Sequence, residues 1–112
     1  MEELSVITVM YEVYNKMLRI TAALDKKYRF TLGEQAVLSA RAVLRELFFA
    51  KHAARPDKMG YIRKAEAEAE LVAVQLRAIL ELDLANATNC LKIQAKLAEA
   101  RRMIGGWRKS LS

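Results

Sequence analysis

The stretch CLKIQAKLAEARRMIGGWRKSL, residues 90–111, carries the clearest apolar pattern of the chain. Apolar side chains recur in it at alternating intervals of three and four residues: Cys90, Ile93, Leu97, Ala100, Ile104, Trp107 and Leu111. These intervals place them on one side of an α-helix, with basic side chains flanking the stripe. The stretch therefore predicts an amphipathic helix that buries one face.

Three further segments have similar patterns, so we expect helices at about residues 3–24, 32–53, 58–82 and 88–104. The stripe of the first runs through Leu4, Ile7, Tyr11, Tyr14, Leu18 and Thr21, widened by Met10, Met17 and Leu24. That of the second runs through Val37, Ala40, Leu44 and Leu47, and that of the third through Ile62, Ala65, Ala69, Val72, Leu76 and Ile79. Four amphipathic helices with short connections predict an all-α, antiparallel up-down four-helix bundle, a single domain over residues 1–112.

Residues at the helix ends predict where each helix begins. Thr31 and Glu34 have the spacing of a capping box, in which the hydroxyl accepts from a backbone N–H and the carboxylate reaches back. Asp57 is a candidate N-cap for the third helix, and Asn86 or Thr88 for the fourth. These caps would leave only short loops between the helices.

Aromatic and glycine residues predict how the ends of the bundle are closed. Phe30 precedes Thr31, the place of a hydrophobic staple, so we expect it to plug one end. Gly105 and Gly106 predict the end of the last helix, where a left-handed residue satisfies free carbonyls. Trp107 continues the apolar stripe, so it is expected to anchor the core rather than stack on a nucleobase.

The charge of the chain favours an anionic partner. Lys and Arg number 19 against 13 Asp and Glu, which gives a net charge of +6. From Leu84 onward six residues are basic and only Glu99 is acidic. Nucleic acid is the first candidate partner, ahead of an acidic protein or a membrane surface, and a merely solvated basic face is the alternative. The 54% apolar content of so short a chain also predicts a homo-oligomer.

The sequence offers little for catalysis or metal binding. His52 is the only histidine, and Cys90 is the only cysteine and lies on an apolar stripe. No glycine loop for phosphate and no Glu-x-x-His pattern occurs, so we expect no enzyme, no catalytic residue, no metal and no cofactor. A helical enzyme built on Arg41, Arg45 and Glu46 is conceivable but has no specific support.

The same composition indicates a cytoplasmic protein. One cysteine excludes an intramolecular disulfide, which fits a reducing compartment. The N-terminal residues Glu2 and Glu3 differ from the basic start of a signal peptide, and no apolar run is long enough to span a bilayer. We therefore expect no membrane partner.

Two motifs resemble a known family. The segment RMIGGWRKS, residues 102–110, is similar to the C-terminal signature of the accessory variability determinant (Avd) proteins of diversity-generating retroelements, in which Gly-Gly-Trp precedes a Lys-Ser pair. Arg108 stands at the variable position of that signature. RFTLGEQ, residues 29–35, resembles the start of the family's second helix, and the length and basic charge also agree. The resemblance covers nearly the whole chain.

The resemblance implies a non-catalytic partner of a reverse transcriptase. Avd proteins form homopentameric barrels of four-helix protomers, bind nucleic acid and associate with the retroelement's reverse transcriptase. They support mutagenic cDNA synthesis and retrohoming. For this chain the resemblance thus implies RNA, DNA, the reverse transcriptase and further copies of itself as partners.

Basic residues on the expected helices and loops are the candidate phosphate contacts. They are Lys26, Lys27, Arg29, Arg41, Arg45, Arg101, Arg102, Arg108 and Lys109. Two alternatives stay open. In the first, the chain is a helical protein–protein adaptor whose basic face docks an acidic partner. In the second, it is a four-helix protein of the ribosomal-RNA intervening-sequence type without a reverse transcriptase partner. The Gly105-Gly106-Trp107 motif argues against the latter.

Overall fold

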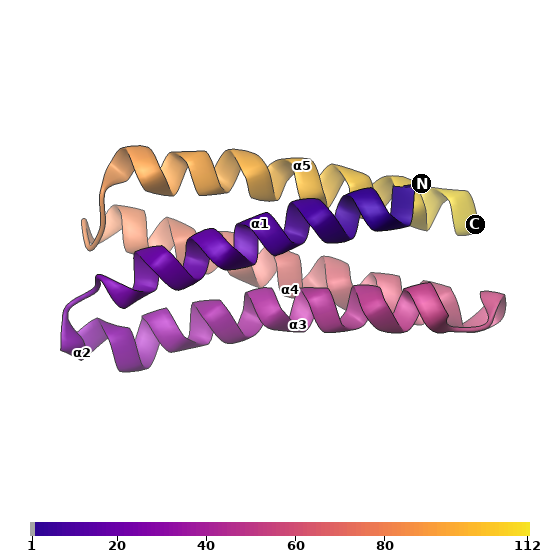
Figure 1. The fold of residues 1–112 in the computed structure, drawn as a ribbon, viewed down its shortest axis with the longest axis horizontal. Coiled ribbons are helices and arrows are strands. Elements are labelled where there is room, and N and C mark those ends of the chain that lie inside the picture. Colours follow the sequence, from indigo (N-terminus) through magenta and orange to yellow (C-terminus); the bar gives the residue numbers. More distant parts are fainter. Residues whose placement is uncertain (1) are drawn as a thin grey trace.

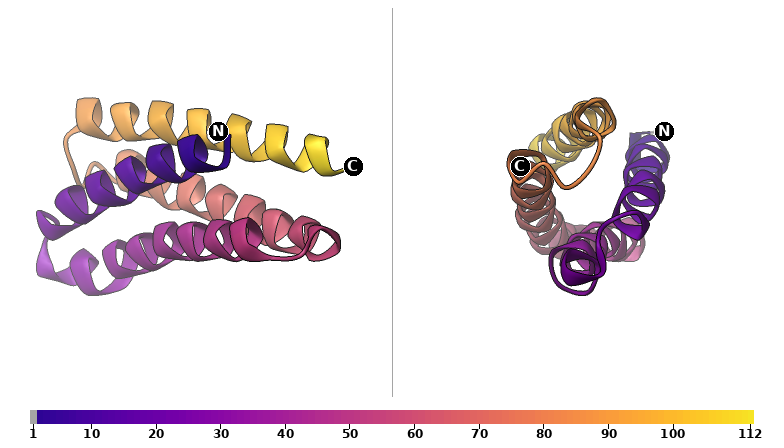
Figure 2. Two further views of the ribbon diagram at one scale, coloured as in Figure 1. Left: turned by 45° about the vertical axis from the view of Figure 1, so that its right-hand side comes forward. Right: turned by 90° about the vertical axis from the view of Figure 1, so that its left-hand side faces the viewer.

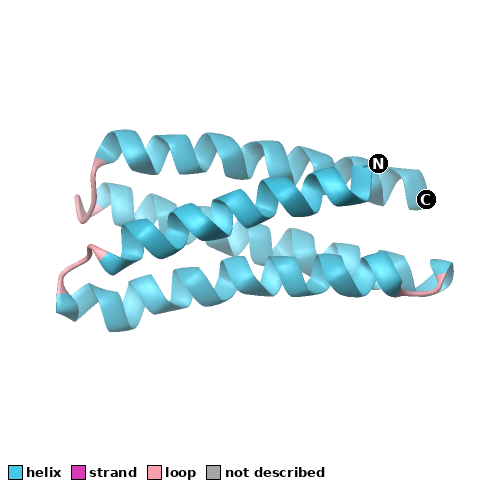
Figure 3. Cartoon of the chain, viewed as in Figure 1, coloured by secondary structure: helices cyan, strands magenta, loops and turns pink. Residues whose placement is uncertain are grey.

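The computed structural model describes residues 2–112, with side chains from residue 5 onward. Four long helices dominate it: α1 (Glu2–Ala22), α3 (Glu34–His52), α4 (Arg55–Glu81) and α5 (Ala87–Leu111). A single turn, α2 (Lys26–Tyr28), and a π-helical turn, η1 (Arg29–Gly33), join α1 to α3. Residues 2–112 contain no strand, so the predicted all-α class is confirmed (Figure 3).

The long helices run alternately up and down the bundle, as Figure 1 shows. Each packs against its two antiparallel neighbours, α1 and α4 both lying against α3 and α5. The end-on view of Figure 2 shows the four axes around a common centre. Short connections leave no room for crossovers, which is why sequence neighbours are also spatial neighbours.

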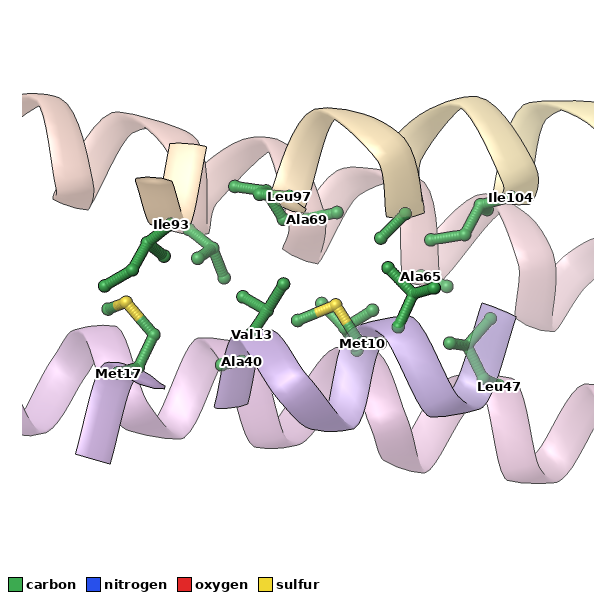
Figure 4. Close-up of a cluster of buried hydrophobic side chains, with 14 of the residues drawn as sticks. Met10, Val13, Met17, Ala40, Leu47, Ala65, Ala69, Ile93, Leu97 and Ile104 are labelled. Atoms are coloured by element: carbon green, nitrogen blue, oxygen red, sulfur yellow. The ribbon is translucent and has the colours of Figure 1, made fainter. Parts of the chain in front are cut away.

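The core fills the space between the four helices (Figure 4). Met10 and Met17 from α1, Leu47 from α3 and Leu97 and Ile104 from α5 are at most 1% exposed. The core also includes Ala65 and Ala69 of α4, whose small side chains let neighbouring helices approach closely. Burying each large apolar side chain contributes roughly 1.5–3 kcal/mol, most of which conformational entropy offsets.

The apolar stripes predicted for α4 and α5 are confirmed, whereas that of α1 is confirmed only in part: Met10, Met17, Thr21 and Leu24 are buried, and Leu4 lies outside the residues whose side chains are described. Tyr11 and Leu18 lie outside the core, 54% and 40% exposed. The buried stripe instead runs through Val6, Met10, Val13, Met17, Ile20 and Leu24. In α3 the predicted Ala40 and Leu47 are buried, but Val43 and the small residues beside it complete the face.

The sequence predicts that the last helix ends at Gly105 and Gly106, but the helix continues to Leu111. Neither Gly105 nor Gly106 has a positive φ angle, so no left-handed cap forms there. The continued helix carries Trp107 into the core, where it is 5% exposed. Its burial is worth more than the roughly 1 kcal/mol that each helical glycine loses relative to alanine.

The expected capping box at Thr31 and Glu34 is also wrong. Thr31 lies inside η1, and its hydroxyl donates to the carbonyl of Lys27 at 3.0 Å instead of accepting at a helix start. The helical backbone of η1 runs directly into α3, so the first N–H groups of α3 already have carbonyl partners and need no cap. Gly33 within η1 packs closely under the end of α1.

The α3–α4 turn is shorter than predicted. Helix α4 begins at Arg55, with Pro56 in its first turn, where the missing N–H of proline costs nothing. Asp57 is therefore a first-turn residue rather than the N-cap. Lys58 fastens the turn, since its Nζ donates to the carbonyls of Ala50 at 2.7 Å and Lys51 at 3.1 Å at the end of α3.

The loop from α4 to α5 sets the start of the last helix. Asp83 adopts a left-handed conformation with φ 54°, and the N–H of Leu84 donates to the carbonyl of Ile79 at 3.0 Å. The side chain of Asn86 accepts from the N–H of Asn89 at 3.0 Å, which confirms Asn86 as the predicted N-cap. The loop thereby directs α5 back alongside α1.

Candidate nucleic-acid interface

The nine predicted phosphate contacts do not form one patch. Lys26, Lys27 and Arg29 lie on α2 and η1, at the end of the bundle labelled α2 in Figure 1. Arg41 and Arg45 lie along α3. The remaining four, Arg101, Arg102, Arg108 and Lys109, lie on the C-terminal half of α5, toward the opposite end. We refer to them as the turn, α3 and α5 groups.

Most of these cations are open to solvent. All except Arg108 are exposed, and no ion pair involves any of those eight within the described residues. Arg108 is half-buried, and its Nε lies 2.9 Å from Oε1 and 3.1 Å from Oε2 of Glu66 on α4. This ion pair makes Arg108 a link between α4 and α5 rather than a free cation.

The turn group places cations beside two aromatic rings, the half-buried Tyr28 and the exposed Phe30. The Nζ of Lys27 lies 5.4 Å from the ring centre of Tyr28, and the guanidinium of Arg29 lies 5.3 Å from that of Phe30. Phe30 is 62% exposed, so the prediction that it plugs the bundle is wrong: η1 turns the ring outward instead of onto the core. Cations next to exposed rings are suited to phosphates and unstacked bases.

The α3 group lines an apolar groove shared with α1. Arg41 and Arg45 border it together with Tyr14, Leu44, Phe48, Phe49 and His52, and no carboxylate lies among the lining residues. Phe48 and Phe49 are 45% and 50% exposed, and Phe49 stacks on Tyr61 with ring centres 5.3 Å apart. The groove offers positive charge and aromatic surface together.

The α5 group faces a mixed environment. Arg101 and Arg102 line a cleft of about 620 Å³ between α4 and α5, which Glu66 and Glu70 also line. The carboxylates offset part of the positive charge at this position. The net positive charge at this cleft is therefore lower than the number of its arginines suggests.

One cationic cluster is missing from the sequence prediction. Lys16 and Arg19 of α1 line a groove with Lys92 of α5. Lys16 and Arg19 are three residues apart on one helix face, which is a local signal of a basic ridge. Nothing in the sequence shows that Lys92 lies opposite them, because this depends on how α1 and α5 pack.

Comparison with known proteins supports the fold. No family model and no curated protein matches the chain. Its structure is similar to a crystal structure of a protein with unknown function from the S23 ribosomal protein family of Bacteroides thetaiotaomicron. The TM-score is 0.88 at 16% sequence identity, and the match covers 97% of this chain and 99% of the other. The two chains share a four-helix fold.

Other reactive groups lie apart from one another. Cys90 is buried in the core, and desolvation raises the pKa of its thiol, which disfavours the nucleophilic thiolate. His52 is exposed at the end of α3. Within the described residues no three His, Cys, Asp or Glu side chains gather as metal ligands. None of the helices described combines the length and the apolar character that crossing a bilayer requires.

Proposed function

We propose that this protein is a basic, non-catalytic accessory subunit that binds nucleic acid and associates with the reverse transcriptase of a diversity-generating retroelement. It would support mutagenic cDNA synthesis and retrohoming. The observation that carries the nucleic-acid part is the state of the predicted cations, eight of which are exposed without an ion pair within the described residues. Such cations can exchange their counterions for phosphates, which drives association.

The proposal of a reverse transcriptase as partner rests on the resemblance of RMIGGWRKS and RFTLGEQ to segments of Avd proteins. The helical bundle is compatible with this family and does not by itself identify the partner. A four-helix protein of the ribosomal-RNA intervening-sequence type would have the same fold, so the two candidates differ in whether a reverse transcriptase binds.

Self-association is the second part of the proposal. Large apolar side chains are 40% or more exposed on every long helix: Tyr11, Leu18, Leu38, Phe48, Phe49, Leu71, Val74 and Leu91, in addition to Leu82 just after α4 and Phe30 of η1. Phe48 and Phe49 are adjacent and line one groove with Leu44, and contiguous apolar surface of this kind favours contact with further copies. A pentamer would carry a formal charge of about +30, a strong field for a polyanion.

Fluorescence anisotropy with unrelated RNA and DNA over a range of salt concentrations tests nucleic-acid binding. We expect the logarithm of the association constant to fall linearly with that of the salt concentration. Arg45→Gln should reduce the magnitude of the slope by about 1 for each contacting copy. Arg77→Gln is the matched control, since Arg77 is paired with Glu81 at 2.8 Å and its loss removes the same formal charge.

Absence of binding to RNA and DNA at low salt would contradict a nucleic-acid function and leave the protein–protein adaptor. An equal change of slope in the Arg45 and Arg77 variants would contradict the assigned contact and indicate only an effect of net charge. Circular dichroism of both variants establishes that they are folded.

Co-purification with a reverse transcriptase encoded beside this chain tests the partner. We expect the two proteins to elute together, and cDNA synthesis on the element's RNA template to require this chain. A reverse transcriptase that elutes alone and yields the same products without the chain would favour the intervening-sequence type of protein.

A further inference from the structure

The groove between α1 and α5 carries an unusual concentration of positive charge. It has a volume of about 530 Å³ and lies near the α4–α5 loop. Lys16, Arg19 and Lys92 line it together with Asn86 and Asn89. No carboxylate is among its lining residues, and none of the three cations has an ion pair within the described residues.

The same pair of helices balances its charges one turn further along. There Nζ of Lys96 lies 2.9 Å from Oε2 of Glu12 and 3.5 Å from Oε2 of Glu99. Lys16 follows Glu12 by four residues and Lys92 precedes Lys96 by four, so each is one helical turn away. The ion pairs of Lys96 thus lie one helical turn from three cations that have no ion pair within the described residues. Like charges in a groove repel, and an anion seated among them removes this repulsion.

The start of α5 adds to the field in the groove. Helix α5 is 25 residues long, and the groove includes its N-cap Asn86 and its first-turn residue Asn89. The N-terminal end of a helix carries a partial positive charge, which favours phosphate and other anions. The Oδ1 of Asn86 already accepts from the N–H of Asn89, and the side-chain NH2 groups of both asparagines are potential donors to a phosphate oxygen.

We propose that the α1–α5 groove is a phosphate-binding site, separate from the turn, α3 and α5 groups. Three cations and a helix start suit a ligand with two or more negative charges, as in adjacent backbone phosphates or a free oligophosphate. The site itself stands on the residues of the groove. That nucleic acid supplies the phosphate rests on the function proposed above.

Thermal unfolding in the presence of sodium tripolyphosphate tests the site. Trp107 is the only tryptophan and lies at the opposite end of α5, so its fluorescence follows unfolding without touching the groove. In a phosphate-free buffer, with NaCl adjusted to constant ionic strength, we expect tripolyphosphate to raise the midpoint in a saturable manner, by more than about 2 °C. Lys92→Gln and Arg19→Gln should each abolish most of the rise.

Arg63→Gln is the matched control. Arg63 is an exposed residue of α4 without an ion pair within the described residues, and its loss lowers the net charge by the same amount. The rise should persist in this variant. A rise that is the same in the Lys92, Arg19 and Arg63 variants, or no rise in the unaltered protein, would overturn the site. The midpoint of each variant in tripolyphosphate is compared with the midpoint of the same variant in NaCl alone. A change in stability caused by the substitution itself therefore does not affect the measured rise.

Competition with a fluorescent single-stranded RNA identifies the source of the phosphate. If tripolyphosphate displaces the RNA from the unaltered protein and Lys92→Gln weakens RNA binding, the groove holds the nucleic-acid backbone. If tripolyphosphate stabilises through the groove while RNA binds undisturbed, the ligand is a free oligophosphate. RNA binding without any tripolyphosphate site would refute the phosphate site in the groove and leave the proposed function intact. A tripolyphosphate site without RNA binding would support the site in the groove and contradict the proposed nucleic-acid function.

Discussion

The glycines of this chain are of two kinds, although all of them lie in helical backbone. A Cβ atom on Gly33 would lie 3.1 Å from Cδ1 of Leu24 and 3.3 Å from Cβ of Thr21. No atom lies within 4 Å of the corresponding position on Gly60, Gly105 or Gly106. A side chain at position 33 would therefore crowd its neighbours, whereas the other glycines lie in open surroundings and only lower the stability of their helices.

Alanine substitutions separate the two kinds. Gly60→Ala should raise the free energy of unfolding by about 0.5–1 kcal/mol, because it restricts the unfolded chain and meets open space. Gly33→Ala should lower the free energy of unfolding, since crowding against Leu24 and Thr21 costs about 1–3 kcal/mol and exceeds the gain in helix propensity. Urea denaturation followed by circular dichroism measures both. A shift of the two variants in the same direction would contradict this account.

At the scale of the element, helix α5 has one face buried in the core and one face exposed to solvent. Leu97 is 1% exposed in the core, and Leu91, six residues before it on the same helix, is 54% exposed. The two side chains are identical, so the difference in their contributions to stability reflects their surroundings alone.

Truncation of these two leucines tests the packing of α5. Leu97→Ala should lower the free energy of unfolding by about 2–5 kcal/mol, because it opens a cavity. Leu91→Ala should change it by less than about 0.5 kcal/mol when measured at low protein concentration. A large and concentration-dependent loss at Leu91 would instead place this residue in a contact between copies.

Two elements show what the sequence could predict and what it could not. The stripes of α4 and α5 were predictable because each has a single apolar face. Helix α1 has two, one through Tyr11 and Leu18 and one through Met10 and Met17, and periodicity alone does not rank them. Tyrosine tolerates the surface, so the face with valine and methionine is buried. At Gly105 a local signal for a helix end was outweighed by the burial of Trp107.

At the scale of the whole molecule, charge is spread along a body of 44 × 22 × 18 Å. Cations that are close in sequence could be grouped from the sequence, whereas cations on different helices could not, because their grouping depends on which helices are neighbours. Lys16 and Lys92 are 76 positions apart and line one groove. Only the antiparallel packing of α1 against α5 brings them together.

The mass of the protein in solution tests the proposed assembly. Light scattering coupled to size-exclusion chromatography should give about five times the chain mass of 12.7 kDa. The midpoint of thermal unfolding should also rise with protein concentration, because association stabilises the folded chain. A mass of one chain at micromolar concentration, with an unchanged midpoint, would refute self-association.

The close packing of Gly33 against Leu24 and Thr21 has a consequence for the energetics of binding. Because η1 packs against Leu24 and Thr21 of the preceding segment and continues into α3, the backbone that carries Lys26, Lys27 and Arg29 is helical rather than an extended loop. A preorganised backbone loses little conformational entropy when a ligand arrives. A bulkier residue at position 33 should therefore weaken the affinity of this end for polyanions even where every lysine and arginine is retained.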